Sequence, residues 1–355
     1  MAFRSFPIVT PLRFQEISRR YSELRVALVG DFCLDRYLEI DPARKEISIE
    51  TGREVHNVVF VRSQPGGAGT ILNNLSALGI GTIYPVGFCG EDGEGYELLR
   101  ALRSRPGVLL DHFIRTRERR TFTYCKPLLV EAGRPPVELN RLDSKNWTPT
   151  PQNVEEVLVN SLRALAGAVD AVIVLDQVDV PETGVVTSGV LAALGDLARE
   201  NPKLLVLADS RRGLKEFPPL TFKMNAAELA RLMGRAGELA LAEIEEAAAE
   251  LAQRNRQRVF VTLAERGMSG AAADGAVAHV PALPVRGPID IVGAGDAVTA
   301  NLTAALAGGA SVREALEVAS AAASCVIHQL GTTGTASVSD ISALLTEASG
   351  AVADT

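Results

Sequence analysis

Short apolar runs alternate with helical patterns along most of this chain. From residue 151 onward the alternation is regular, and each short apolar run is followed by a longer pattern of helical period. Strands are expected at 170–175, 203–208, 221–224 and 257–262, and helices at 151–166, 183–199, 226–233 and 238–255. Strand–helix–strand repeats of this length are typical of a mainly parallel sheet with helices on both faces. The pattern therefore predicts an α/β fold.

The remaining elements extend this pattern toward both ends. A helix at 13–24 and a buried strand ending at Asp31 are expected first. They are followed by a helix from the glycine-rich run 66–69 to Leu78, a strand at 82–88, a helix at 92–102 and a strand at 108–113. A hairpin at 268–280 precedes a glycine loop, and the last helices are expected at 294–307, 312–328 and 340–347. With no repeat or long linker in view, we predict a single domain over 1–355.

Two segments, 46–62 and 113–141, lie outside this alternation. Both contain extended-type residues, but they are polar and irregular. They predict a small separate β-sheet, which could act as a lid. In the second segment arginines alternate at 115, 117 and 119, which would place them on one face of a strand. A solvated outer face is the favoured interpretation, and contact with a substrate phosphate is the alternative.

The segment Asp290–Asp296 carries the clearest candidate chemistry. Glycines at 293 and 295 allow a tight turn and bring backbone N–H groups close to a ligand. The N-terminus of the helix that follows adds unpaired N–H groups and partial positive charge, so an anion is expected there. Asp296 would then take the proton of an attacking hydroxyl during phosphoryl transfer. The alternative is that Asp296 only caps the helix.

Two commoner glycine motifs are excluded. The dinucleotide fingerprint needs a glycine where this chain has Val298, and the Gly-Lys-Ser/Thr run of a P-loop occurs nowhere. A bound nucleotide would therefore use another scaffold.

Polar residues also follow the expected strands, at the edge where open α/β sheets bind ligands. They are Asp31, Asp176, Asp209, Asn225 and Thr262.

Composition narrows the class of protein. The 355 residues are 47% hydrophobic and 22% charged, which is typical of a globular protein, and the net charge of −7 argues against a nucleic-acid or anionic-membrane partner. The four cysteines form no CxxC pair and indicate reduced, mostly buried thiols of a cytoplasmic protein. We expect no signal peptide at Met1–Leu12 and no membrane span. The four histidines are scattered along the chain, which argues against a zinc site.

Several motifs occur in a characteristic order and spacing. In chain order they are Gly30-Asp31 with Leu34-Asp35-Arg36-Tyr37, Pro65-Gly66-Gly67-Ala68, Asn225-Ala-Ala-Glu228, Val261-Thr262 with Glu265-Arg266-Gly267-Met268, Asp290 to Asp296, and Leu330-Gly331-Thr332. Together they resemble the ribokinase/PfkB family of carbohydrate kinases, from about Val26 to Ser337. Within that family the chain is most similar to the kinase domain of bacterial heptose-phosphate kinases.

The resemblance implies a ribokinase-like fold and an ATP-dependent kinase that phosphorylates a hydroxyl of a sugar or sugar phosphate. Asp296 would be the catalytic base, and the N–H groups of Gly293, Ala294 and Gly295 would form an anion hole. The implied substrate contacts are Asp35, Gly66, Gly67, Thr70 and Arg141. The implied nucleotide contacts are Asn225, Glu228, Thr262, Glu265, Gly267 and Ser320.

The resemblance also implies cofactors and partners. Asn225 and Glu228 would place Mg²⁺ through water, since a hard cation prefers oxygen ligands, and Asp290 and Gly331 could join a K⁺ site. The lid would exclude water and could form a homodimer. Many such kinases are fused to a nucleotidyltransferase domain, which we do not expect here because the chain ends too soon.

Three departures from the family pattern keep alternatives open. Val292 replaces a usual threonine, Thr70 replaces a usual asparagine, and the run 177–181 lacks the glycine–lysine pair found after the aspartate at 176 in heptose-phosphate kinases. One alternative is a kinase of a nucleoside or vitamin-like alcohol, because fold does not fix substrate. The other is a non-catalytic ligand-binding relative, although Asp296 and the anion-hole glycines persist.

Overall fold

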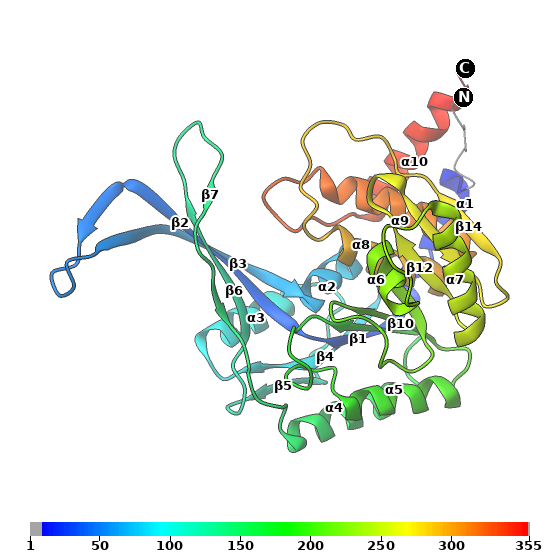
Figure 1. The fold of residues 1–355 in the computed structure, drawn as a ribbon, viewed down its shortest axis with the longest axis horizontal. Coiled ribbons are helices and arrows are strands. Elements are labelled where there is room, and N and C mark those ends of the chain that lie inside the picture. Colours follow the sequence, from blue (N-terminus) through cyan, green and yellow to red (C-terminus); the bar gives the residue numbers. More distant parts are fainter. Residues whose placement is uncertain (1–8, 354–355) are drawn as a thin grey trace.

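The computed structural model describes residues 9–353, with side chains described up to residue 347. Within this part, a nine-stranded sheet crosses the body of the molecule (Figure 1) in the order β14-β13-β12-β11-β10-β9-β1-β4-β5. Its strands are β1 (Arg25–Gly30), β4 (Thr82–Gly90), β5 (Phe113–Thr116), β9 (Ala171–Asp176), β10 (Leu205–Ser210), β11 (Thr221–Asn225), β12 (Val259–Thr262), β13 (Met268–Ala271) and β14 (Val277–Val280). The seven strands from β5 to β12 pair in parallel, and β13 and β14 form an antiparallel hairpin. The predicted parallel sheet and the hairpin at 268–280 are confirmed.

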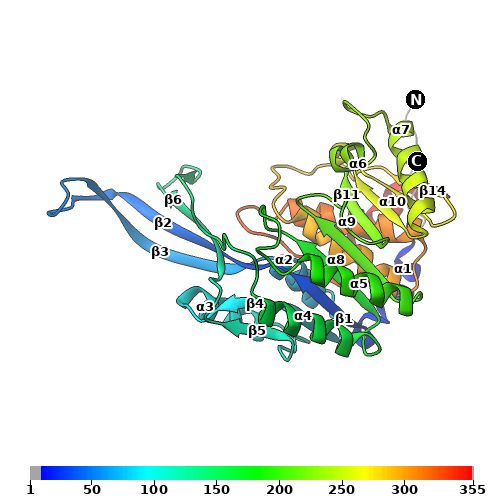
Figure 2. The ribbon, with the colours of Figure 1, turned by 60° about the horizontal axis from the view of Figure 1, so that its bottom comes forward.

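Helices cover both faces of this sheet, as predicted. One face carries α4 (Gln152–Leu165), α5 (Ser188–Glu200), α6 (Ala226–Leu232) and α7 (Leu241–Asn255). The other carries α1 (Pro11–Ser18), α2 (Ala68–Ala77), α3 (Gly93–Arg103), α8 (Ala294–Ala307), α9 (Val312–Ile327) and α10 (Val338–Ala353). Short 3₁₀ turns lie at Tyr21–Glu23 and Ala264–Arg266. Figure 2 shows α4 and α5 in front of the sheet and α8 and α9 behind it.

Strand β1 shows why the apolar runs are continuous. Val26 and Leu28 pack into the core on the α8 side, while Ala27 and Val29 pack into the core on the α4 side. Because successive side chains of a strand point to opposite faces, a strand covered on both faces must be apolar at nearly every position.

No described helix is long and apolar enough to cross a membrane.

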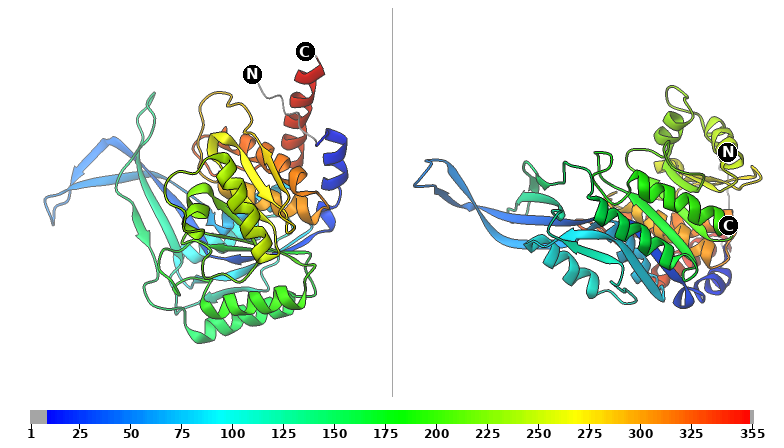
Figure 3. Two further views of the ribbon diagram at one scale, coloured as in Figure 1. Left: turned by 45° about the vertical axis from the view of Figure 1, so that its right-hand side comes forward. Right: turned by 90° about the horizontal axis from the view of Figure 1, so that it is seen from below.

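A second sheet, called the lid below, consists of β2 (Phe32–Ile47), β3 (Glu54–Gly67), β6 (Phe122–Leu129), β7 (Val137–Glu138) and β8 (Leu142–Ser144). Strands β2 and β3 form a long antiparallel hairpin, and β6 pairs in parallel with β2. The hairpin extends far from the body in each view (Figure 3). The prediction of a small separate sheet is therefore confirmed.

The predicted lid segments both start at the wrong residue. The lid begins at Phe32, directly after β1, because the first residues of β2 are buried and resemble core sequence. The segment predicted at 46–62 contains the hairpin turn, which is closed by a hydrogen bond from Ser48 N–H to the Arg53 carbonyl. The first residues of the segment 113–141 form β5, the edge strand of the main sheet, which pairs with β4.

The alternating arginines of this segment do not share one face of a strand. Arg115 lies on β5 and Arg117 in the bend that follows, and both pair with Glu91. Arg119 is buried and donates to the Thr148 carbonyl at 3.0 Å. The prediction failed because the strand ends at Thr116, so the even spacing has no structural meaning.

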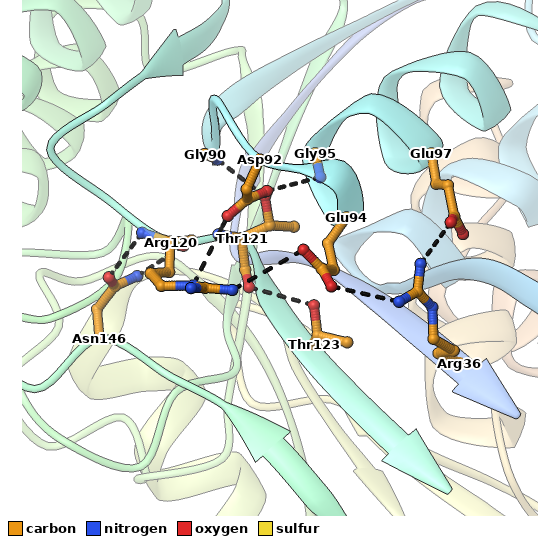
Figure 4. A network of polar contacts seen from close by, with 10 residues as sticks. All are labelled: Arg36, Gly90, Asp92, Glu94, Gly95, Glu97, Arg120, Thr121, Thr123 and Asn146. Atoms are coloured by element: carbon orange, nitrogen blue, oxygen red, sulfur yellow. Dashed lines mark hydrogen bonds and ion pairs between the residues drawn. The ribbon is translucent and has the colours of Figure 1, made fainter. Parts of the chain in front are cut away.

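The base of the lid is fixed to α3 by a polar network (Figure 4). Arg36 on β2 pairs with Glu94 at 3.2 Å and also with Glu97. Asp92, the N-cap of α3, accepts hydrogen bonds from the N–H groups of Gly95 and Thr121 and from the Thr121 hydroxyl. These contacts attach the inner ends of β2 and β6 to the body.

Candidate active site

A cavity of about 390 Å³ lies between the lid and the carboxyl ends of the central strands. This is the size of a small-molecule site. It adjoins β1 and β9, where the strand order reverses, and open α/β sheets bind ligands at such a point. The lining residues are Asp35, Gly67, Thr70, Tyr124, Lys126, Arg141, Leu175, Gln177, Asp209, Arg211, Lys223, Glu228, Val292, Gly293, Gly295, Asp296 and Thr333.

One end of the cavity is formed by the turn at 290–293 and the first turn of α8, which we call the phosphate corner. Gly293 is the N-cap of α8 with φ of 84°, a conformation that favours glycine. Asp290 Oδ1 accepts the Val292 N–H at 3.0 Å and so shapes the turn. The predicted helix at 294–307 is confirmed, and its N-terminus presents a partial positive charge to the cavity.

Two details of this corner differ from expectation. The N-cap is Gly293 and not Asp296, which lies in the first turn of the helix with its side chain in the cavity. Asp296 is therefore not the N-cap of α8, and the alternative that it only caps the helix is wrong. In addition, the Ala294 N–H donates to the Ile291 carbonyl at 3.2 Å, so this member of the predicted anion hole is engaged within the turn.

Lys223 lies next to Asp296 and was not predicted as a site residue. It is only 7% exposed, its ammonium is 2.7 Å from Asp209 Oδ2, and Asp209 also accepts the Thr299 hydroxyl at 3.2 Å. A Cβ at position 295 would lie 3.3 Å from the Lys223 nitrogen, so the lysine lies directly against the glycine backbone of the phosphate corner. The available signal was a lysine between the apolar residues Phe222 and Met224 of the predicted strand at 221–224.

The charges in this corner influence one another. Burial raises the pKa of Asp296 to about 7; Lys223 opposes this increase, whereas Asp209 and Asp35 add to it. Burial disfavours the charge of Lys223, but the carboxylates of Asp209, Asp296 and Glu228 outweigh it and raise the pKa of the lysine. At neutral pH the lysine is therefore charged, and Asp296 can exchange a proton.

The other end of the cavity is the inner face of the lid. Asp35 on β2 points into it, and burial raises the pKa of Asp35 while Lys126 and Arg141 oppose that shift. A Cβ at Gly66 would lie 2.6 Å from Asp35 Oδ2, so the glycine leaves room for this carboxylate. Gly67 has φ of 57°, and a Cβ there would lie 2.5 Å from the Asp31 carbonyl oxygen.

The structure adds cationic and polar groups that the sequence did not single out. Lys126, Arg211, Tyr124, Gln177 and Thr333 all line the cavity. Among the predicted arginines, Arg141 is in this lining, where it also pairs with Asp143 at 3.1 Å. These residues come from strands and loops far apart in the chain, so no local motif could have grouped them.

Asp31 holds the loop that carries Gln177. Its buried carboxylate accepts the N–H groups of Gln177, Val178 and Val185 at 2.7–3.2 Å. The sequence predicted a helix at 183–199. The observed helix α5 begins at Ser188, after the N-cap Thr187, because the residues before it belong to this loop. Asp31 therefore has a structural role beside the cavity.

Most of the predicted nucleotide residues lie outside the cavity lining. Asn225 and Glu228 form a reciprocal capping box at the start of α6, each side chain accepting the other's N–H. Of this group, Glu228 lines the cavity. The others lie outside the lining: Thr262 ends β12, Glu265 and Gly267 follow it in a turn, and Ser320 lies in α9. Asp290 and Gly331, the suggested K⁺ residues, also lie outside it.

The described residues contain no group of three or more His, Cys, Asp or Glu side chains arranged to hold a metal ion. The water-mediated Mg²⁺ site expected at Asn225 and Glu228 involves fewer protein ligands and remains a prediction. The cysteines agree with the sequence analysis, since all four are unpaired and Cys33, Cys89 and Cys125 are buried.

A family model described as pfkB family carbohydrate kinase matches residues 26–338. The chain belongs to this family. Among curated relatives, the bifunctional protein HldE of Azorhizobium caulinodans is 31% identical over 308 residues, covering 86% of this chain and 61% of the relative. The protein of the same name from Gluconacetobacter diazotrophicus is 32% identical over 327 residues, covering 92% and 64%. The chain thus spans about three fifths of the length of these relatives.

Solved structures of the pfkB-type fold agree with the architecture. Arabidopsis thaliana ribokinase complexed with ribose and ATP has a TM-score of 0.66 at 20% identity, covering 91% of this chain and 98% of that protein. Escherichia coli phosphofructokinase-2 in complex with fructose-6-phosphate has a TM-score of 0.67 at 19% identity, covering 92% and 99%. The predicted ribokinase-like fold is confirmed, as is the prediction of a carbohydrate-kinase family.

Proposed function

We propose that this pfkB-family chain transfers the γ-phosphoryl group of ATP to a hydroxyl of a sugar or sugar phosphate. The observation that carries the proposal is the position of Asp296. Its carboxylate lies in the cavity within the first turn of α8, beside Lys223, and does not cap the helix. A carboxylate with a raised pKa at a cationic corner is suited to accept a proton where a phosphoryl group is transferred.

In this mechanism Asp296 removes the proton of the acceptor hydroxyl as its oxygen attacks the γ-phosphorus. The bond between the γ-phosphorus and the bridging oxygen breaks, and ADP leaves with the electron pair. Negative charge on the transferred group is stabilised by the N-terminus of α8, with N–H groups of Gly293 and Gly295, and by Lys223. Ala294 would contribute if ligand binding releases its N–H from the Ile291 carbonyl.

The lid end of the cavity would hold the acceptor. Asp35, beside Gly66 and Gly67, can accept two hydrogen bonds from a sugar diol, and Thr70 adds a hydroxyl from α2. Lys126, Arg141 and Arg211 supply positive charge near the same end. Such cations suit a phosphate group on the acceptor, so this end favours a sugar phosphate over a neutral sugar.

ATP would extend from the phosphate corner along Thr262, Glu265, Gly267 and Ser320. Use of ATP and a monovalent cation is supported by two structural neighbours, the ribokinase complexed with ribose and ATP and the Escherichia coli phosphofructokinase-2 in complex with potassium. Here Glu228 lies in the cavity near Lys223 and suits water-mediated placement of Mg²⁺ together with Asn225. Bound Mg²⁺ would neutralise phosphate charge. Asp290 and Gly331 remain candidates for K⁺.

Two further proposals concern the state of the protein. A homodimer through the lid is supported by four consecutive half-exposed apolar residues on the outer part of β3, at 58–61. Sedimentation of the full chain tests this proposal. A cytoplasmic location rests on the unpaired cysteines, and fractionation of the source cells tests it.

The function is tested by measuring ADP release from ATP and Mg²⁺ across a panel of sugars, sugar phosphates and nucleosides. We expect turnover with at least one sugar or sugar phosphate. Turnover with nucleosides alone would favour the alternative of a nucleoside kinase within the same fold. Binding of ATP without turnover on any acceptor would favour a non-catalytic relative, which Val292 and the absent glycine–lysine pair first suggested.

The pH profile should follow the titration of Asp296. The carboxylate must be ionised to accept a proton, and its pKa is raised to about 7. We therefore expect kcat/KM to be constant above this pH and to fall about tenfold for each pH unit below it. A profile that stays flat from pH 8 to pH 5 would contradict the role of Asp296 as the base.

The variant Gly66→Ala tests the acceptor end. A methyl group there would lie 2.6 Å from Asp35 Oδ2 and displace the carboxylate. Loss of hydrogen bonds to a charged group should raise the acceptor KM by about 10-fold to 100-fold, with the ATP KM nearly unchanged. Gly167→Ala is the matched control because nothing lies within 4 Å of the added methyl. An unchanged acceptor KM in Gly66→Ala would remove Asp35 from the acceptor site.

A further inference from the structure

The acceptor end and the phosphate corner are joined by a glutamine that has no part in the mechanism above. Gln64 lies on β3 directly opposite Asp35 on β2. Residues opposite each other in an antiparallel pair project from the same face of the sheet. Gln64 therefore shares the inner face of the lid with the carboxylate proposed to hold the acceptor.

The side chain of Gln64 bridges from the lid to the loop 330–335. Its Nε2 donates to Thr333 Oγ1 at 2.8 Å, and its Oε1 accepts the Thr332 hydroxyl at 3.3 Å. Both ends of the amide are thus used on two adjacent residues of one loop. The two hydrogen bonds join residues that lie about 270 positions apart in the chain.

The loop 330–335 in turn contacts the phosphate corner. Thr333 lines the cavity, and a Cβ at Gly293 would lie 3.2 Å from the Thr333 Cβ. The two ends of the loop are joined by the Gln329 side chain, which donates to the Thr335 carbonyl at 2.7 Å and accepts the Thr335 N–H at 3.1 Å. Thr333 therefore connects the N-cap of α8 with Gln64.

The opposite side of the lid is held in place. Arg36, the neighbour of Asp35 on β2, points to α3 and pairs with Glu94 and Glu97 (Figure 4). The Gln64 bridge is a second attachment of the inner lid, on the side that faces the phosphate corner. A two-state element that two ligands both contact is the physical requirement for coupling between their sites.

We propose that Gln64 is a positioning residue that couples the two substrates. Through Thr332 and Thr333 it makes ATP at the phosphate corner favour the lid position in which Asp35 meets the acceptor. The proposal rests on the proposed function, since it assigns ATP to one end and the acceptor to the other. By linkage, the acceptor must increase the affinity for the nucleotide by the same factor.

The test compares hydrogen exchange of wild type and Gln64→Met with and without the ATP analogue AMP-PNP and Mg²⁺. Methionine keeps the length of the side chain and removes both hydrogen bonds. In the wild type, the nucleotide should slow exchange in the loop 330–335 and also in the inner part of β3. In Gln64→Met, the slowing should be confined to the loop. This readout needs neither turnover nor a known acceptor.

Two further variants separate coupling from general damage to the lid. Gln64→Glu should restore the protection of β3, because both threonine hydroxyls can donate to a carboxylate. Asn57→Leu removes an amide on the same strand that bonds to the Arg44 carbonyl within the hairpin, far from the loop, and should leave the coupling intact. A second readout uses the acceptor found in the panel and measures the factor by which AMP-PNP tightens its binding. This factor should fall about 10-fold in Gln64→Met and keep its wild-type value in Asn57→Leu.

Protection of β3 that is the same in wild type and Gln64→Met would overturn the proposal, as would a wild type in which AMP-PNP protects the loop and leaves β3 unchanged. Both results are compatible with an active kinase, so they would leave the proposed function standing. Failure of AMP-PNP to bind the wild type would instead contradict the proposed function, and the coupling with it.

Discussion

Replacing Asp296 with asparagine is expected to lower kcat by about 10²-fold to 10⁴-fold, the usual contribution of a general base. Asparagine keeps the shape of the side chain but cannot accept the hydroxyl proton. Affinity for ATP should stay the same or increase, since a negative charge is removed from the phosphate corner. Steady-state kinetics together with calorimetric titration of AMP-PNP separates these two effects.

A matched control is Asp340→Asn, which changes another carboxylate in the first turn of a helix. Asp340 lies at the start of α10 and bonds only locally to Ser337 in the described contacts. Turnover of this control should resemble wild type. If Asp296→Asn also keeps wild-type turnover while binding ATP, the carboxylate in the cavity is not the base.

Replacing Lys223 with methionine is expected to have the second largest effect, for two separable reasons. The variant removes a buried positive charge beside the transferred group, which should lower kcat by about 10²-fold to 10³-fold. It also leaves Asp209 without the ammonium at 2.7 Å, and breaking a buried ion pair destabilises a protein by about 3–5 kcal/mol. Kinetics and thermal unfolding measure the two effects independently.

The double variant Lys223→Met with Asp209→Asn removes both charges of the pair. The Thr299 hydroxyl can still donate to the amide oxygen of the new side chain. Most of the lost stability should therefore return, while turnover should stay low. Recovery of turnover together with stability would show that Lys223 acts only through the fold.

The lysine also influences the pH profile of the residual activity. Because Lys223 opposes the increase in the pKa of Asp296, its removal should raise that pKa above about 7 and shift the acid limb of kcat/KM to higher pH. An acid limb at the same pH as in wild type would show that Lys223 does not influence the pKa of the base. Changes in stability alone would not shift this limb.

The parts of the fold that the sequence predicted well are those set by local pattern. The helix at 294–307 has the predicted bounds because a glycine turn precedes it and apolar periodicity continues through it. The parallel strands were recognised because both faces of each are buried. The lid boundaries were missed because β2 continues directly from β1 with a buried, core-like start, and because the edge strand predicted at 108–113 is observed as β5 at Phe113–Thr116, inside the second segment.

The candidate site shows the same division. Asp296, the two glycines beside it and Asp35 belong to local motifs, and the structure brings them into one cavity. Lys223 was missed because its neighbours on β11 are apolar and its partner Asp209 lies on another strand. Asn225 and Glu228 show the converse, since their motif also forms a capping box that would stabilise α6 with no ligand at all.

The central claim is that the cavity transfers a phosphoryl group to an acceptor, and the most direct test follows the γ-phosphate itself. Wild type would be given ATP labelled with ³²P in the γ position, Mg²⁺ and the acceptor found in the panel. The account predicts that the label appears in a phosphate ester of the acceptor, in equal amount to ADP, and that Asp296→Asn forms almost none. Label that appears only in inorganic phosphate, at the same rate with and without the acceptor, would contradict it.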